Sequence, residues 1–123
     1  MTTYADVQFH LDTKIPMRDG VELSADIYLP RADGPFPTVL FRTAFSRADE
    51  SGKGRLLANM GYVCVVQNFR GRYGSDGVAV PFHSEGDDGY DTFAWIAQQA
   101  WSNGKIGTGG GSYMGMAQWL SLI

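Results

Sequence analysis

Ser112 is the side chain in this sequence best suited to act as a nucleophile. It stands in the segment Ile106-Gly107-Thr108-Gly109-Gly110-Gly111-Ser112-Tyr113-Met114-Gly115, in which a glycine cluster follows a short expected strand and precedes an apolar stretch. A strand, a sharp turn of small residues and a following helix form a nucleophile elbow, whose tight backbone exposes the serine hydroxyl. The N–H of the next residue, here Tyr113, then points at the developing oxyanion. The pattern predicts covalent catalysis through an acyl-Ser112 intermediate.

Two glycines flank this serine with the spacing Gly110-x-Ser112-x-x-Gly115. The second glycine comes one residue later than in the usual elbow, so other interpretations have to be weighed. A phosphate-binding loop needs Gly-Lys-Ser or Gly-Lys-Thr after its glycines, and a dinucleotide-binding loop needs a third glycine where this chain has Ser112. Both match poorly. A flexible turn whose serine caps the next helix stays open at this point.

Two histidines, His10 and His83, are candidates for the base that a serine nucleophile needs. His10 alternates with Val7, Phe9 and Leu11 in an expected strand, so we expect it on the solvent side. His83 lies in a polar stretch before an expected helix, where a surface position is the default. Neither histidine is a convincing base.

The composition is that of an ordinary globular domain of 123 residues, 44% hydrophobic and 19% charged. A net charge of −3 gives no positive field for nucleic acid or anionic lipid. The apolar runs are too short to span a membrane, and residues 1–6 show no secretory signal. The single cysteine, Cys64, cannot form an internal disulfide, which favours the cytoplasm. No residues have metal-ligand spacing, and we expect no cofactor.

The strands that must position the serine are marked by apolar periodicity. Residues 6–14 and 21–29 carry apolar side chains at period two, and the turn Arg18-Asp19-Gly20 between them favours an antiparallel hairpin. Residues 38–41 and 62–66 are continuous apolar runs typical of buried strands, the second covered on both faces. Residues 105–108 form a very short strand before the glycine cluster, after Ser102-Asn103-Gly104 has ended the preceding helical segment.

Helical spacing indicates the remaining elements. We expect a helix over residues 51–60, capped by Gly61, and a buried helix over residues 114–123. Between them a third helix presents an apolar stripe of Tyr90, Phe93, Ala94 and Ala97. The alternation predicts an α/β fold, parallel beyond the hairpin, in one partial domain over residues 1–123. No cap follows the apolar residues up to Ile123, so we expect a truncated chain.

Six segments together resemble the X-Pro dipeptidyl-peptidase and cocaine esterase group of α/β-hydrolases. They are Ile15-Pro16-Met17-Arg18-Asp19-Gly20-Val21-Glu22-Leu23, Arg42-Thr43-Ala44-Phe45, Arg70-Gly71-Arg72-Tyr73-Gly74-Ser75, Asp88-Gly89-Tyr90-Asp91-Thr92, Trp101-Ser102-Asn103-Gly104-Lys105 and Gly110-Gly111-Ser112-Tyr113-Met114-Gly115. They occur in the family's order and run through nearly the whole chain.

The resemblance implies a serine hydrolase with nucleophile Ser112 that acts on acyl esters or on peptide or amide bonds, with a small-molecule ester or short peptide as substrate. It implies the N-terminal portion of the α/β-hydrolase fold, truncated after the nucleophile elbow, because the family's catalytic Asp and His lie beyond Ile123. We therefore expect the chain alone to be inactive and to self-associate through an exposed strand edge. The alternative hypothesis is a non-catalytic hydrolase remnant or an interaction protein.

Two positions depart from the family's pattern. Phe45 stands where the family usually has a tyrosine whose hydroxyl joins the Tyr113 N–H in the oxyanion hole. Asn68 stands where the family usually has Asp, which weakens any charge pairing with Arg70 or Arg72.

The remaining polar and aromatic residues have structural interpretations. We expect Arg70 and Arg72 to form a loop-bracing network with nearby carboxylates rather than a substrate clamp, the candidates being Asp76, Asp87 and Asp91. The three tryptophans are expected to pack in the core or between helices; they are Trp95, Trp101 and Trp119.

Overall fold

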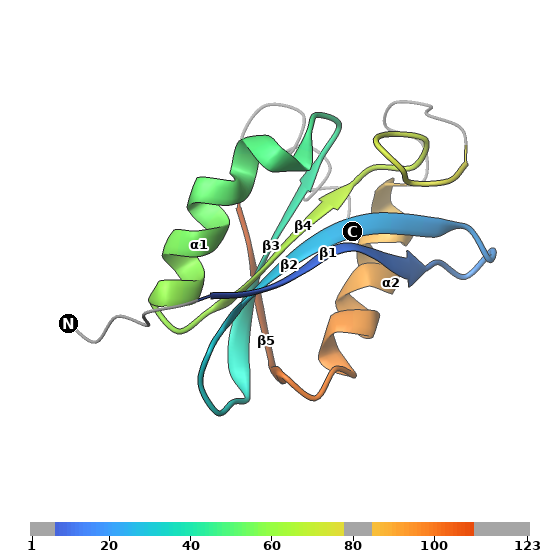
Figure 1. Ribbon diagram of the computed structural model, residues 1–123. Coiled ribbons are helices and arrows are strands. Elements are labelled where there is room, and N and C mark those ends of the chain that lie inside the picture. The colour runs from blue at the N-terminus through green and yellow to red at the C-terminus, as the bar shows by residue number, and fades with distance from the viewer. Residues whose placement is uncertain (1–6, 78–84, 110–123) are drawn as a thin grey trace.

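The computed structural model describes residues 7–77 and 85–109. Its elements are β1 (Val7–Pro16), β2 (Glu22–Pro30), β3 (Phe36–Thr43), the 3₁₀ helix η1 (Arg47–Glu50), α1 (Ser51–Asn59), β4 (Val63–Asn68), α2 (Glu85–Ala97) and β5 (Ser102–Thr108). The strands form one sheet in the order β1-β2-β4-β3-β5, with α1 and α2 on opposite faces (Figure 1). The β1–β2 hairpin is antiparallel, and β3 runs parallel to both β4 and β5. The expected α/β class is confirmed.

The hairpin differs from expectation in the direction of its first side chains. Phe9 and Leu11 were expected on a half-buried inner face, yet they are 42% and 64% exposed. A bulge with Asp12 at a φ of 53° interrupts the register between His10 and Thr13. Phe9 lies opposite Tyr28 before the bulge, whereas Ile15 lies opposite Leu23 in the other core after it. The extra residue reverses the alternation of faces.

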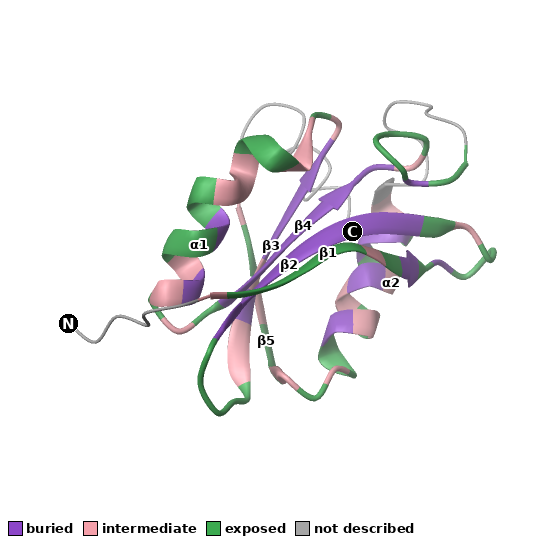
Figure 2. Cartoon of the chain, in the orientation of Figure 1, coloured by how far each residue is buried: buried purple, intermediate pink, exposed green. Residues whose placement is uncertain are grey.

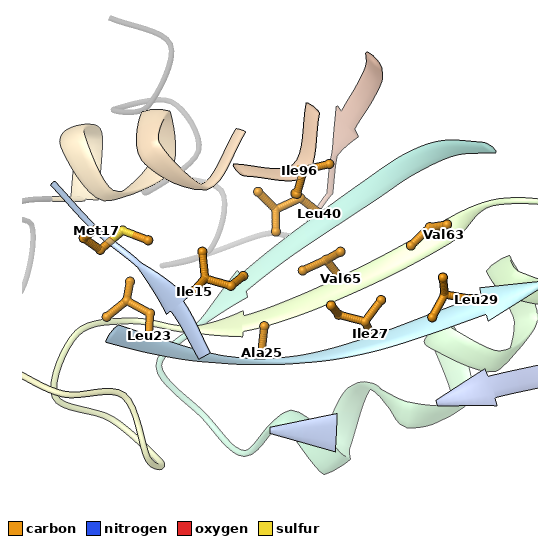
Figure 3. Close-up of a cluster of buried hydrophobic side chains, with 10 residues drawn as sticks. All are labelled: Ile15, Met17, Leu23, Ala25, Ile27, Leu29, Leu40, Val63, Val65 and Ile96. Atoms are coloured by element: carbon orange, nitrogen blue, oxygen red, sulfur yellow. The ribbon is translucent and has the colours of Figure 1, made fainter. Parts of the chain in front are cut away.

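The larger core lies between the sheet and α2. Its ten buried side chains are Ile15, Met17, Leu23, Ala25, Ile27, Leu29, Leu40, Val63, Val65 and Ile96 (Figure 3). All six residues of β4 are buried, because this strand contributes side chains to both faces of the sheet (Figure 2). The prediction of a doubly covered strand is confirmed. Trp95 and Trp101 pack against this core with their rings 6.2 Å apart, as expected of packing aromatics.

The smaller core lies between the sheet and α1. It consists of Tyr28, Phe41, Ala58, Cys64 and Val66. Burial raises the pKa of the Cys64 thiol to about 12, which is the environment of a packing side chain rather than a reactive one. The expected cap at the end of α1 is present: Gly61 has a φ of 94° and donates its N–H to the Ala58 carbonyl.

The helix α2 was expected to bury Tyr90, Phe93, Ala94 and Ala97, and this prediction of its inner face is wrong. Tyr90 is 64% exposed, Ala94 and Ala97 are exposed, and Phe93 is only partly buried. The buried positions are instead Asp88, Gly89, Thr92 and Ile96. The two polar side chains can face inward because each finds a partner there: Asp88 bonds to Arg70, and Thr92 to Gln67.

The segment that follows α2 also differs from expectation. Ser102, Asn103 and Gly104 were expected to end a helical segment, but α2 ends at Ala97 and these residues already belong to β5. Phe36 donates its N–H to the Trp101 carbonyl and pairs with Ser102, so that β5 is a seven-residue strand. Neither of the α-helices among the described residues is long and apolar enough to cross a membrane.

Candidate active site

The carboxyl end of β5 lies at the sheet edge where α/β proteins place their ligands, and the expected elbow follows it in the sequence. Thr108, the last residue of β5, pairs with Leu40 of β3, and the Gly109 N–H donates to the Leu40 carbonyl at 3.2 Å. The chain therefore leaves β5 beside Leu40, three residues before β3 ends. The predicted nucleophile Ser112, the oxyanion donor Tyr113 and the elbow glycines Gly110 and Gly115 lie outside the described residues.

Gly109 is required at this exit from β5. A Cβ at this position would lie 2.5 Å from Cε1 of Phe41, a buried residue of the smaller core. By contrast, a Cβ at Gly107 would meet no atom within 4 Å. One glycine of the cluster thus has a defined packing role, since only a residue without a side chain fits against the Phe41 ring.

Phe45 projects from the loop that follows β3, at the same edge of the sheet. Its side chain is 64% exposed. Its N–H donates to Thr43 Oγ1 at 3.0 Å, and its carbonyl accepts a hydrogen bond from Asn68 Nδ2 at 2.7 Å. The structure therefore places Phe45 in the loop at the carboxyl end of β3, with its own N–H already occupied.

Asn68 was expected to weaken any charge pairing with Arg70 or Arg72. Its side chain instead contacts the loop after β3, where Nδ2 donates to the carbonyls of Thr43 and Phe45. Its Oδ1 accepts from Arg47 Nη1 at 2.7 Å. Since Asn68 ends β4, it connects the carboxyl ends of two neighbouring strands.

Arg47 links this loop to three further segments. Its guanidinium donates to Asp26 Oδ1 at 3.0 Å in β2 and to the Tyr73 carbonyl at 2.7 Å, and it lies 3.4 Å from Asp12 Oδ1 in the β1 bulge. The side chain is only 13% exposed. Sequence analysis missed Arg47, because its partners come from four separate places in the chain.

Arg70 braces the loop after β4, as expected, but with other carboxylates than those expected. It donates to both oxygens of Asp88, at 3.0 and 2.7 Å, and to Asp19 Oδ2 at 2.9 Å. These hydrogen bonds, those to Asp88 above all, raise the pKa of the guanidinium. Asp87 and Asp91 pair instead with Arg18 of the hairpin turn.

Arg42 is a second residue that sequence analysis did not single out. It is 1% exposed in β3, donates from Nε to Gln67 Oε1 at 2.9 Å, and its guanidinium carbon lies 5.0 Å from the centre of the Phe69 ring. The sequence did contain a signal for Arg42, because it directly follows the apolar run 38–41. A charged side chain at that position has to find partners inside the sheet.

His10 lies far from the candidate site. It belongs to β1, at the end of the strand order opposite β5, and it is exposed beside Gln8. The prediction of a solvent-side histidine is confirmed. His83 lies outside the described residues. Within residues 7–77 and 85–109, no group of three or more His, Cys, Asp or Glu side chains is arranged to hold a metal ion.

Comparison with known proteins gives a consistent result. The model of the X-Pro dipeptidyl-peptidase (S15) family matches residues 19–122. The chain is 39% identical over 115 residues to cocaine esterase from Rhodococcus sp. (strain MB1 Bresler), covering 89% of this chain and 20% of the esterase.

Two solved structures are similar to this chain in both fold and sequence. An alpha-amino acid ester hydrolase matches with a TM-score of 0.85 and 30% identity, over 95% of this chain and 23% of the hydrolase. A CocE/NonD family hydrolase from Staphylococcus aureus matches with a TM-score of 0.83 and 30% identity, over 91% of this chain and 24% of its own. The chain thus spans about a fifth to a quarter of the length of these proteins.

Proposed function

Because this chain belongs to the X-Pro dipeptidyl-peptidase (S15) family and the relatives compared above are hydrolases, we propose that it supplies the nucleophile segment of a serine hydrolase. The observation that carries the proposal is the exit of β5. Gly109 packs against Phe41 directly after the carboxyl end of β5, and this edge of the sheet is where α/β proteins place their ligands, which supports a nucleophile in the segment that follows.

In the proposed reaction, Ser112 Oγ attacks the acyl carbon while a histidine base from outside this sequence takes its proton. The Tyr113 N–H and the loop after β3 stabilise the tetrahedral oxyanion. Collapse of this intermediate expels an alcohol or amine, which receives the proton from the base. Water then hydrolyses the acyl-Ser112 ester by the same steps and releases the acid.

We favour an ester over a peptide substrate. The support comes from the relatives, since one is a cocaine esterase and another an amino acid ester hydrolase. A comparison of kcat/KM for a small acyl ester and for the corresponding amide in the complete protein tests this choice. A higher kcat/KM for the amide would contradict it.

The experiment that tests the nucleophile is covalent labelling of the complete protein with a fluorophosphonate, followed by mass spectrometry. We expect the adduct on Ser112, and loss of both adduct and ester hydrolysis in Ser112→Ala. Ser102→Ala is the matched control, because that hydroxyl lies at the start of β5 and only accepts a hydrogen bond from the Gly104 N–H. An adduct on another serine would overturn the assignment. Absence of any labelling would favour the alternative of a non-catalytic remnant.

Two further proposals concern the surroundings of the chain. Among the described strands β5 pairs only with β3, so its other edge offers backbone groups for self-association of the isolated chain. A monomeric profile in size-exclusion chromatography would contradict this.

The buried free thiol of Cys64 supports a reducing compartment such as the cytoplasm. Cell fractionation tests that location.

A further inference from the structure

Three residues near the start of β5 lie outside its ladder with β3. Ser102 and Ile106 are both paired with β3, and the only β3 residue between their partners is Pro37. Proline has no N–H with which to bond to the opposite strand. Residues 103–105 are all exposed. The resulting bulge leaves the Asn103-Gly104 peptide outside the paired part of the strand.

Two hydrogen bonds fix the side-chain amide of Asn103 and the backbone nitrogen of Gly104 that follows it. Asn103 Oδ1 accepts from the Lys105 N–H at 2.9 Å, and the Gly104 N–H donates to Ser102 Oγ at 3.1 Å. Gly104 has a φ of 86°, and a Cβ at this position would meet no atom within 4 Å. The Gly104 nitrogen thus bonds to a hydroxyl, and no side chain of its own shields it.

We propose that Asn103 is a modification site, at which the backbone nitrogen of Gly104 displaces the side-chain amide. The Gly104 nitrogen gives its proton to water or hydroxide and forms a bond to Asn103 Cγ, which closes a cyclic imide. The Cγ–Nδ2 bond breaks, and Nδ2 takes a proton from water and leaves as ammonia. Water then opens the imide at either carbonyl, which gives aspartate or isoaspartate without any oxidation or reduction.

The neighbours of Asn103 assist this reaction. When the nitrogen attacks, negative charge develops on Asn103 Oδ1, and the Lys105 N–H already donates to that oxygen. The Ser102 hydroxyl accepts the Gly104 N–H and so polarises the N–H bond of the attacking nitrogen. The bulge therefore supplies a donor for the developing oxyanion and an acceptor for the departing proton.

The other two asparagines of the sequence are held differently. The Met60 N–H, which follows Asn59, donates to carbonyls inside α1 at 3.0 and 3.1 Å. The Phe69 N–H, which follows Asn68, donates at 3.0 Å to the carbonyl of the last residue of β3. Neither nitrogen can attack the preceding side chain without breaking a backbone hydrogen bond, so the reaction is confined to Asn103.

The test is timed incubation of the complete protein at mildly alkaline pH, followed by tryptic digestion and mass spectrometry. Peptide 73–105 contains Asn103 as its one asparagine, and peptide 56–70 contains Asn59 and Asn68. Relative to a sample digested without incubation, we expect the mass gain of deamidation in the first peptide alone. Labelling by an isoaspartyl methyltransferase should fall on the same peptide, because the cyclic route produces isoaspartate and direct hydrolysis does not.

Variants at three positions test the role of the bulge. Gly104→Ala should slow the modification about tenfold or more, because a Cβ crowds the attacking nitrogen and disfavours the positive φ. Gly107→Ala is the matched control, since its Cβ also meets open space in the same strand, and it should leave the rate at Asn103 unchanged. Asn103→Gln keeps an amide but requires a larger ring, so this side chain should stay intact.

Three outcomes would overturn the proposal. An Asn103 that stays intact in the folded protein would do so, and modification in urea alone would show that the bulge protects it. Equal mass gains in the two peptides would show that the fold does not select the site. Aspartate without isoaspartate would rule out the cyclic route. None of these readouts depends on ester hydrolysis, so each is separate from a test of the proposed function.

Discussion

Arg70 and Asp88 lie 18 residues apart and form a two-point ion pair that joins the loop after β4 to the first turn of α2. The side chains are 17% and 4% exposed, so the pair is largely shielded from water. This contact explains why the Asp88 carboxylate faces inward. The apolar residues of α2 had predicted that a different face of this helix is buried.

We expect Asp88→Asn to destabilise the complete protein by about 2–3 kcal/mol, because a guanidinium in a buried pair loses its main counter-charge. Thermal or denaturant unfolding measures the change. Asp87→Asn is the control, since its side chain is 71% exposed and the change should be within about 0.5 kcal/mol. Similar effects of the two substitutions would contradict a stabilising role for the buried pair.

The pair of Arg18 and Asp91 should make stability depend on pH. Hydrogen bonds from the Arg18 side chain, and one from its backbone N–H, hold the pKa of Asp91 below its ordinary value. A depressed folded-state pKa contributes stability that is complete above the unfolded pKa of about 4 and is lost as the pH falls through the folded value.

Asp91→Asn should therefore lower the thermal midpoint at pH 7, and the gap to wild type should narrow below about pH 4. Melting curves from pH 7 to pH 2.5 follow the gap. Asp33→Asn, in the exposed loop before β3, should show no such convergence. A gap that stays constant across the acid range would show that the Asp91 charge contributes nothing.

Gly109→Ala should disturb the exit of β5. The added Cβ collides with the Phe41 ring, so we expect a lower thermal midpoint and a loss of ester hydrolysis of about tenfold or more, since the nucleophile segment shifts. Gly107→Ala is the matched control, because it meets open space two residues earlier. Phe41→Leu, which removes the ring, should partly rescue Gly109→Ala. Equal effects of the two alanine variants would refute the packing argument.

Phe45→Tyr should raise kcat for ester hydrolysis in the complete protein. The exposed ring leaves space for a hydroxyl, and a hydrogen bond to the oxyanion would contribute about 1.5–3 kcal/mol if added to the backbone donors. Steady-state kinetics on an activated ester measure the gain. Phe9→Tyr adds the same hydroxyl to a half-exposed ring on β1 and should change nothing. An unchanged kcat would mean that the oxyanion hole is complete without this side chain.

Cys64 should resist alkylation in the folded protein. With a pKa of about 12 and no exposed surface, its thiol is neither ionised nor accessible at pH 8. We expect iodoacetamide to modify Cys64 only after unfolding, as mapped by mass spectrometry of the peptide that contains it. Rapid modification under native conditions would show that the smaller core is not closed.

The sequence by itself predicted most of the elements, together with a candidate nucleophile. The run Tyr62–Val66 predicted the doubly covered strand, because a continuous apolar run rich in β-branched residues is typical of a strand buried on both faces. Gly61 marked the end of α1, and Gly20 marked the hairpin turn, where its φ is 85°. Ser112 stays a prediction, drawn from a motif within ten residues and from the resemblance to the family. These are local properties, in which the chain itself carries the physical reason for the structure.

Only the tertiary structure decided which faces and side chains meet. The bulge at Asp12 reversed the faces of β1, and the inward partners of Asp88 and Thr92 rotated α2 relative to its apolar stripe. Asn68 bonds to the loop after β3 across 23 and 25 positions of the chain. Such contacts depend on the order of strands in the sheet, and no local pattern encodes that order, because hydrogen bonding between strands is set by packing of the whole domain.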